Sequence, residues 1–278
     1  FAGFGAADDR AAAVTVDSSG SLFVVGTSGA DGRVIKYDRF GVEQWAQPFG
    51  AGANGHAYAV TTDAANSVYV AGVEDIFGQA TNWRIRQFSH DGIPGWLSSY
   101  DDPAKNLDVA YGIAPDPVGG FIVVGAENRA DLTGQFNNWR INRYATDGSL
   151  MWGRDYNNPG SNQDYAYGVA ADSSNGDFVV AGAERRVDLG QSYDWRVRKY
   201  YRVACLDAAL SFGSPQPAVG QTFTVSLTVT NNGEAAALLV SPTLLIDSGA
   251  AYVTMVSWPT VSLTLTATMS QTFTYTFR

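Results

Sequence analysis

The chain has 278 residues, 45% of them hydrophobic and only 16% charged, so it carries enough apolar surface to build folded cores. Its formal charge of −9 excludes nucleic acid as an expected partner, because that binding depends on phosphate neutralisation by Lys and Arg. The single cysteine, Cys205, excludes an internal disulfide. No stretch approaches the ~18 apolar residues of a membrane helix, so we expect no membrane insertion.

The chain begins at Phe1 without a signal peptide, and we interpret it as a mature product or a fragment. Its richness in Thr, Ser, Gly, Asn and aromatic residues, with little Lys, is typical of exported proteins. An extracellular or cell-surface location is therefore expected.

A four-fold internal repeat spans the first three-quarters of the chain, with a period of roughly 50 residues. Each unit opens with a segment ending in aspartate, continues with a segment ending in glycine, and has a third segment running from arginine to an aromatic residue. The first segments end at Asp17, Asp63, Asp116 and Asp172; the second at Gly26, Gly72, Gly125 and Gly182; the third segments begin at Arg33, Arg84, Arg140 and Arg196. In the first three units, a fourth segment carries Trp45, Trp96 or Trp152 after a turn glycine.

Four short β-branched segments separated by Asp, Ser and Gly turns predict one antiparallel blade of a β-propeller. The last unit lacks the turn and the tryptophan of a fourth strand. Residues 1–5 match the end of such a strand, since Phe4-Gly5 aligns with Phe49-Gly50. Either they close a ring of four blades, or the array was cut from a longer one. We predict an all-β fold with a four-bladed propeller over residues 1–203.

The segment Asp164–Ser174, followed by Val179–Gly182, resembles the SBBP-type β-propeller repeat of secreted bacterial proteins. The pieces Asp108–Asp116 and Val34–Gly41 resemble it too. The resemblance implies a propeller in an extracellular setting, but no single activity, because propellers host many functions.

Residues 204–278 are predicted to form a second domain, an immunoglobulin-like β-sandwich. The segment from Pro217 to Gly233 alternates with period two and ends in an Asn-Gly turn, and it resembles CARDB-type modules of bacterial surface proteins. Further strands are expected over residues 236–247, 252–258, 261–266 and 271–277.

Such modules normally have one more strand after the one that ends here at Phe277, so the sandwich is expected to lack its last strand. Either the chain is truncated, or another subunit supplies the strand by β-augmentation. In the second case the subunit contact is made by Thr272, Phe273, Thr274, Tyr275, Thr276 and Phe277.

The propeller topology places the longer loops on one rim, where a Trp-Arg pair recurs in three units. The pairs are Trp83-Arg84, Trp139-Arg140 and Trp195-Arg196. One interpretation is a set of aromatic platforms for a sugar or a protein partner. The other is structural: each tryptophan packs on the neighbouring blade, and the arginines pair with Glu74, Glu127 and Glu184.

Asp9, Asp108 and Asp164 recur where the first strand of a unit begins. Converging carboxylates can hold Ca²⁺, and a loop-capping role is the alternative. No other cofactor is expected.

The only histidines, His56 and His90, are predicted on different rims without a serine or cysteine motif, so we assign no catalytic residue and expect no enzyme. The favoured function is that of an extracellular structural or surface-assembly protein, a filament or surface-layer subunit that polymerises by strand addition. Its partners are copies of itself or other surface proteins. The alternative is a carbohydrate- or protein-binding adhesin that binds glycans or proteins on the long-loop rim.

Overall fold

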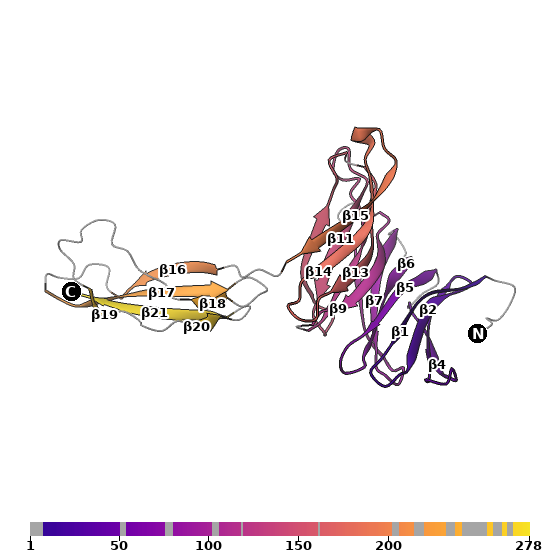
Figure 1. The fold of residues 1–278 in the computed structure, drawn as a ribbon, viewed down its shortest axis with the longest axis horizontal. Helices are drawn as coiled ribbons and strands as arrows, with labels where there is room; N and C mark the ends of the chain where they lie inside the picture. Colours follow the sequence, from indigo (N-terminus) through magenta and orange to yellow (C-terminus); the bar gives the residue numbers. More distant parts are fainter. Residues whose placement is uncertain are drawn as a thin grey trace. The chain divides into compact units, whose positions relative to one another are not determined.

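The computed structural model is all-β and divides into two compact units, residues 1–200 and 201–278 (Figure 1). The structure describes residues 8–50, 54–75, 80–101, 106–117, 119–160, 162–201, 206–213, 220–231, 237–240, 255–257, 263–265 and 269–278. Within these ranges, the one helix is the 3-10 turn Val187–Leu189, and no helix is long and apolar enough to cross a membrane.

The first unit consists of four antiparallel sheets, each formed by consecutive strands. Sheet 1 contains β1 (Asp9–Val16), β2 (Leu22–Ser28), β3 (Asp31–Tyr37) and β4 (Glu43–Pro48). Sheet 2 contains β5 (Gly55–Thr62), β6 (Val68–Asp75), β7 (Thr81–Phe88) and β8 (Pro94–Tyr100). Sheet 3 contains β9 (Val109–Pro115), β10 (Phe121–Asn128), β11 (Asn137–Tyr144) and β12 (Leu150–Tyr156). Sheet 4 contains β13 (Asp164–Ala171), β14 (Phe178–Arg185) and β15 (Tyr193–Tyr200).

The strands predicted in each repeat are confirmed, and among the described residues sheet 4 lacks a fourth strand, as the missing turn and tryptophan indicated. The backbone N–H of Asp108, just before the first strand of sheet 3, donates to the carbonyl of Thr81, the first residue of β7 in sheet 2, at 2.7 Å. This contact supports the predicted rim assignment, because it joins the start of the first strand of one sheet to the start of the third strand of the preceding sheet.

The sheets pack face to face in chain order, and β1, β5, β9 and β13 lie side by side (Figure 1). We call the side of a sheet that faces the next sheet its leading face, and the opposite side its trailing face. Phe23 and Val25 of the leading face of sheet 1 are buried against Val68 and Val70 of the trailing face of sheet 2. Similar apolar clusters join sheet 2 to sheet 3 and sheet 3 to sheet 4.

The described sheets form an open series. Val14 on the trailing face of sheet 1 is 60% exposed, and Trp195 on the leading face of sheet 4 is 86% exposed. The alternative in which four blades close into a ring is therefore not what the described residues form. Residues 1–5, which complete the last sheet in one of the two alternatives, lie outside the described ranges.

The second unit has two small antiparallel sheets. The first has the order β16 (Leu206–Phe212), β17 (Phe223–Asn231), β21 (Ser270–Phe277) and β19 (Met255–Ser257); the second pairs β18 (Ala237–Val240) with β20 (Leu263–Leu265). Alternate residues of β17 and β21 enter a common core with Val240 and Leu265. The sequence did not predict β16, where Leu210 and Phe212 are exposed and mark no buried face.

Strand β21 is not the open edge that the sequence predicted. It lies between β17 and β19, and Thr276 and Phe277 pair with Ser257 and Met255. The side chains of Phe273, Tyr275 and Phe277 are buried in the core. For Thr276 and Phe277 the prediction of a subunit contact by strand addition is wrong, because an earlier strand of the same chain returns to cover them.

Candidate functional site

Each innermost strand of the first unit contains a β-bulge at the same point of the repeat. The register between the first two strands shifts after Ala11, Ala57, Ala110 and Ala166, which leaves one residue of the first strand without a counterpart. The extra residues are Ala12, Tyr58, Tyr111 and Tyr167. A bulge re-aims the extra side chain relative to its neighbours, and bulges are common beside functional sites.

The repeated glycine that ends each second segment is explained by this bulge. A Cβ atom on Gly72 would lie 1.9 Å from the carbonyl oxygen of His56, and Gly26, Gly125 and Gly182 meet the equivalent carbonyl at the same distance. Only a residue without a side chain fits opposite the bulge. The repeated glycine therefore marks the position of the bulge, which carries a tyrosine in sheets 2, 3 and 4 and an alanine in sheet 1.

The three bulge tyrosines, together with Tyr165 and Tyr193, form a continuous aromatic row across three sheets. We call this row the tyrosine ladder: Tyr58, Tyr111, Tyr165, Tyr167 and Tyr193. Ring centroids are 5.8 Å apart between Tyr58 and Tyr111, and 5.2 Å between Tyr111 and Tyr167. Tyr165 stacks on Tyr167 at 6.0 Å and contacts Tyr193 at 6.2 Å. At the other end the His56 ring stacks on Tyr58 at 6.1 Å.

The ladder presents neutral phenols to solvent. Tyr167 and Tyr193 are about half exposed, and Tyr58 and Tyr111 are half-buried. Burial, with the neighbouring tyrosines, raises the pKa of Tyr111 to about 12. Burial also raises the pKa of Tyr58. These side chains therefore offer ring faces and hydroxyl groups that both donate and accept hydrogen bonds, and no anion.

A hollow of about 430 Å³ lies between β1 and β5, at the sheet 2 end of the ladder. Its lining combines the Tyr58 ring and His56 with the charged side chains of Asp8 and Arg10. Aromatic surface beside a few polar groups is the usual make-up of a small-molecule or glycan subsite.

The structure corrects the prediction of binding platforms at two of the three tryptophans. Trp83 and Trp139 have no exposed surface. Their indole N–H groups donate to carbonyls of the following sheet, Trp83 to Ala126 at 3.0 Å and Trp139 to Ala183 at 2.9 Å. Each is buried because another sheet covers it, whereas Trp195 is exposed on the last leading face.

The repeated arginines make the predicted glutamate pairs. Arg84 pairs with Glu74, Arg140 lies 3.5 Å from Glu127, and Arg196 lies 3.7 Å from Glu184. None of them is a free platform for a partner, so the structural alternative holds for Arg84, Arg140 and Arg196.

Two of these glutamates also join neighbouring sheets. The Tyr100 hydroxyl at the end of sheet 2 donates to Glu127 of sheet 3 at 2.5 Å, and Tyr156 of sheet 3 donates to Glu184 of sheet 4 at 2.9 Å. Burial raises the pKa of Glu127, although the Tyr100 hydroxyl and Arg140 counteract part of that rise. The Tyr100–Glu127 and Tyr156–Glu184 hydrogen bonds therefore hold neighbouring sheets together.

The weak metal candidates do not converge. Asp108 and Asp164 are fully buried and accept backbone N–H groups of Asn128 at 3.1 Å and Asn158 at 2.8 Å, while Asp9 lies exposed on β1. Burial raises the pKa of Asp164 to about 6 against hydrogen bonds that lower it. Across the described part of the chain, no three His, Cys, Asp or Glu side chains gather as a metal site. Loop capping therefore accounts for Asp108 and Asp164.

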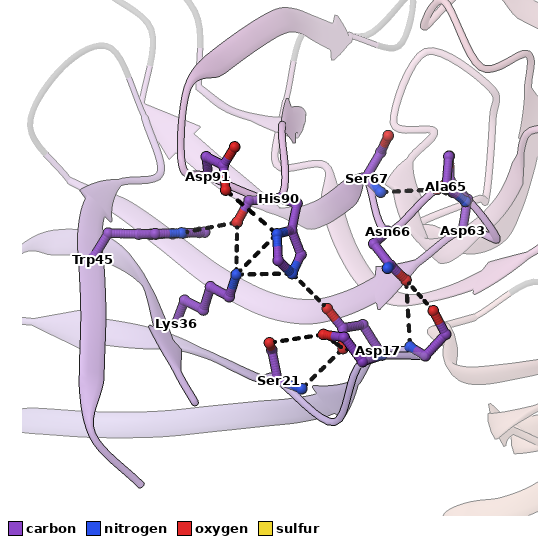
Figure 2. A network of polar contacts seen from close by, with 12 residues as sticks. Asp17, Ser21, Lys36, Trp45, Asp63, Ala65, Asn66, Ser67, His90 and Asp91 are labelled. Carbon is purple, nitrogen blue, oxygen red and sulfur yellow. Dashed lines mark hydrogen bonds and ion pairs between the residues drawn. The ribbon is translucent and has the colours of Figure 1, made fainter. Parts of the chain in front are cut away.

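Figure 2 shows a polar network at the opposite rim, where sheets 1 and 2 meet. His90 lies between Asp17, whose carboxylate is 3.0 Å from the His90 Nε2 atom, and Lys36, which donates to the His90 carbonyl at 3.0 Å. The Trp45 indole donates to the same carbonyl at 3.1 Å. Burial acts to raise the pKa of Asp17, but hydrogen bonds from Ser19 and Ser21 with the nearby His90 lower it overall.

This network resembles catalytic chemistry only in its residue types. The Ser19 hydroxyl donates to Asp17 at 2.7 Å and lies 3.0 Å from the Ser21 hydroxyl. A serine nucleophile requires a hydroxyl bonded to the imidazole, and the described contacts place both hydroxyls on the Asp17 side instead. The network joins sheet 1 to sheet 2.

Sequence reasoning missed the tyrosine ladder, although a signal for it exists. The bulge tyrosine lies between two small residues in three repeats, as Ala57-Tyr58-Ala59, Ala110-Tyr111-Gly112 and Ala166-Tyr167-Gly168. A recurrent small-Tyr-small run in a strand opposite a recurrent glycine indicates a bulge with a re-aimed aromatic side chain.

Comparison with known proteins leaves the chain without an assigned family: no family model matches it, and no curated protein matches it. Among solved structures, the tail fiber of Staphylococcus aureus phage P68 is similar over 83% of this chain and 73% of that chain, at 8% identity and a TM-score of 0.29. A likeness at this level assigns neither fold nor function.

Proposed function

We propose that this chain is an extracellular, non-catalytic binding protein that holds an extended glycan along the tyrosine ladder. The observation that carries this proposal is the ladder itself. Rings from three successive sheets lie within 6.4 Å of one another in one continuous row, although the repeat that supplies them is otherwise used for core packing.

The chemistry of the ladder favours a polysaccharide over other ligands. Sugar rings present both apolar C–H faces and hydroxyl groups, which match the ring faces and neutral hydroxyls of tyrosine. A polysaccharide also repeats along its length, as the ladder does. The overall charge of −9 opposes polyanionic ligands, and the charged pair Asp8 and Arg10 beside the ladder can orient sugar hydroxyls.

We also propose that the four sheets are blades of an SBBP-type propeller array and that the second unit is an immunoglobulin-like module of the CARDB type. The common bulge, the glycine opposite it and the chain-order stacking support the first assignment. The shared core of the two small sheets supports the second. Both resemblances favour an extracellular or surface location.

The test is binding of a panel of neutral polysaccharides, measured by affinity electrophoresis and calorimetry. We expect Tyr111→Ala to weaken binding by about 10-fold, because Tyr111 contacts the rings of Tyr58, Tyr165 and Tyr167 at the centre of the ladder. Phe40→Ala is the matched control, since Phe40 is an exposed aromatic residue (76%) in a turn away from the ladder.

Tyr111→Phe separates the two contributions, because it keeps the ring and removes the hydroxyl. An intermediate loss is expected. If no polysaccharide binds the wild-type chain, or if Tyr111→Ala and Phe40→Ala bind equally well, the ladder is not a glycan site.

The surface-assembly function remains a second candidate, but not through strand addition at β21, since Thr276 and Phe277 are already paired. A different observation favours it. In the described part of the chain, the first and last sheets each present exposed apolar side chains, Val14 and Val16 on sheet 1 and Trp195 and Val197 on sheet 4, that no further sheet covers.

A further inference from the structure

The leading face of sheet 4 repeats the residues that are buried in the preceding sheets. Trp195 and Val197 are 86% and 52% exposed. Their counterparts in sheet 3, Trp139 and Ile141, are 0% and 1% exposed. The difference comes from position in the array, because the residues are of the same kind and only the covering sheet is missing.

Two of the three internal interfaces, that of sheet 2 with sheet 3 and that of sheet 3 with sheet 4, follow one rule. Trp83 of sheet 2 lies against Gly125 of sheet 3, where a Cβ atom would come within 2.9 Å of the indole ring. Its N–H donates to the carbonyl of the next residue, Ala126. Trp139 of sheet 3 makes the same bond to Ala183, which follows Gly182 of sheet 4.

The trailing face of sheet 1 has the same receiving site without a tryptophan in it. Gly26 and Thr27 occupy the positions of Gly125 and Ala126. A hollow of about 250 Å³ lies there, and its lining includes Gly26, Thr27, Ile35 and Tyr37. Beside it, Val14 is 60% exposed, whereas its counterpart Val60 in sheet 2 is 8% exposed.

A buried polar group at this hollow also lacks a partner. Arg33 lines the hollow, and its buried Nε atom has no hydrogen-bond partner among the described residues. In sheets 2 to 4 the equivalent arginine pairs with a glutamate, but sheet 1 has Ser28 in that place. A docked chain that brings an acceptor to Arg33 would satisfy a group that has no partner within the described ranges.

We propose that a second copy of this chain places the leading face of its sheet 4 on the trailing face of sheet 1, with Trp195 in the hollow. The Trp195 indole N–H then donates to the Thr27 carbonyl, which continues the bonds of Trp83 and Trp139. This contact continues the two internal interfaces that contain Trp83 and Trp139, since both halves of a further one are present on one chain. The contact is heterologous, so two copies close into a ring or many extend into a filament.

The test uses two variants that each block one half of the contact. Trp195→Glu leaves only the sheet 1 face competent, and Val14→Glu leaves only the sheet 4 face. Sedimentation velocity over a concentration series is expected to show self-association of the wild type and weakening by at least about 30-fold in each variant alone, as for a central interface tryptophan. An equimolar mixture of the two variants is expected to form a one-to-one dimer and nothing larger.

Both substituted side chains are exposed, so we expect each variant to have the same thermal unfolding midpoint as the wild type. An unchanged midpoint would show that the loss of self-association is not due to misfolding. Ile93→Glu is the control, because Ile93 is 67% exposed in a turn of sheet 2 outside both faces. It should self-associate like the wild type.

Three outcomes overturn the proposal. The first is a wild type that stays monomeric at roughly 100 μM, a concentration at which micromolar contacts are well populated. The second is association of Trp195→Glu or Val14→Glu as strong as that of the wild type. The third is a mixture of the two folded variants that does not form a dimer.

Discussion

Gly72→Ala is the substitution that most directly tests how the bulge positions the ladder. The added Cβ atom would lie 1.9 Å from the His56 carbonyl oxygen and 3.0 Å from the Ala57 Cα atom, and both are main-chain atoms. No side-chain rotation relieves this clash. The innermost strand must move by about an ångström, against its pairing with β6 on both sides of the bulge.

The expected cost follows from two opposing effects. Replacing glycine by alanine at a compatible site stabilises a protein by about 0.4–1 kcal/mol, because the unfolded chain loses freedom. Overpacking against fixed atoms costs about 1–3 kcal/mol, and the backbone contact here is severe, so the upper end applies. The free energy of unfolding should therefore fall by about 2 kcal/mol.

Urea unfolding of the purified chain measures this difference, with Gly168→Ala as the matched control. Gly168 lies beside the bulge residue of sheet 4, and a Cβ atom there meets nothing within 4 Å. The control should be unchanged or slightly more stable. If Gly72→Ala stays within about 0.5 kcal/mol of the wild type, the glycine is not required by the bulge and the account of the ladder fails.

Trp139→Ala should lower the free energy of unfolding by about 3–5 kcal/mol by leaving a cavity, whereas Trp195→Ala should change it by less than about 0.5 kcal/mol in the monomer; equal losses in urea titrations would contradict the burial difference. Tyr100→Phe should cost about 1–3 kcal/mol at pH 7, because Glu127 loses its inter-sheet donor, and an unchanged midpoint would show that the hydroxyl is not needed. Burial raises the pKa of Asp164 to about 6, above its ordinary value, so the folded state holds this proton more tightly. Its contribution to stability is complete below about pH 4 and is lost as the pH rises through 6, so the stability of the wild type relative to Asp164→Asn should fall over this interval and not rise.

The repeat could be predicted from the sequence because its markers have local causes. Glycine recurs at Gly72 and Gly125 since nothing larger fits opposite the bulge, and Asp63 recurs with Asp17 since its carboxylate accepts backbone N–H groups of the following turn. These requirements are met within a few residues or one strand pair. The order of the strands and the positions of the turns in the repeats could therefore be predicted from the sequence.

The sequence did not indicate which copies of an identical motif are buried and which are exposed. Trp83, Trp139 and Trp195 share the Trp-Arg pair and the same register, yet two are buried and one is exposed. Burial of a residue on a leading face depends on whether another sheet follows, which a local pattern does not encode. For the same reason the prediction of platforms was wrong for Trp83 and Trp139.

Within the four repeats, the sequence by itself determined the strands, their order and the residues that the turns require, because these depend on backbone geometry within one repeat. Only the tertiary structure decided which side chains meet. Tyr58, Tyr111 and Tyr167 lie in different repeats and become one row only when β5, β9 and β13 lie side by side. Stacking of the sheets, a property of the whole array, creates both the ladder and the two uncovered faces.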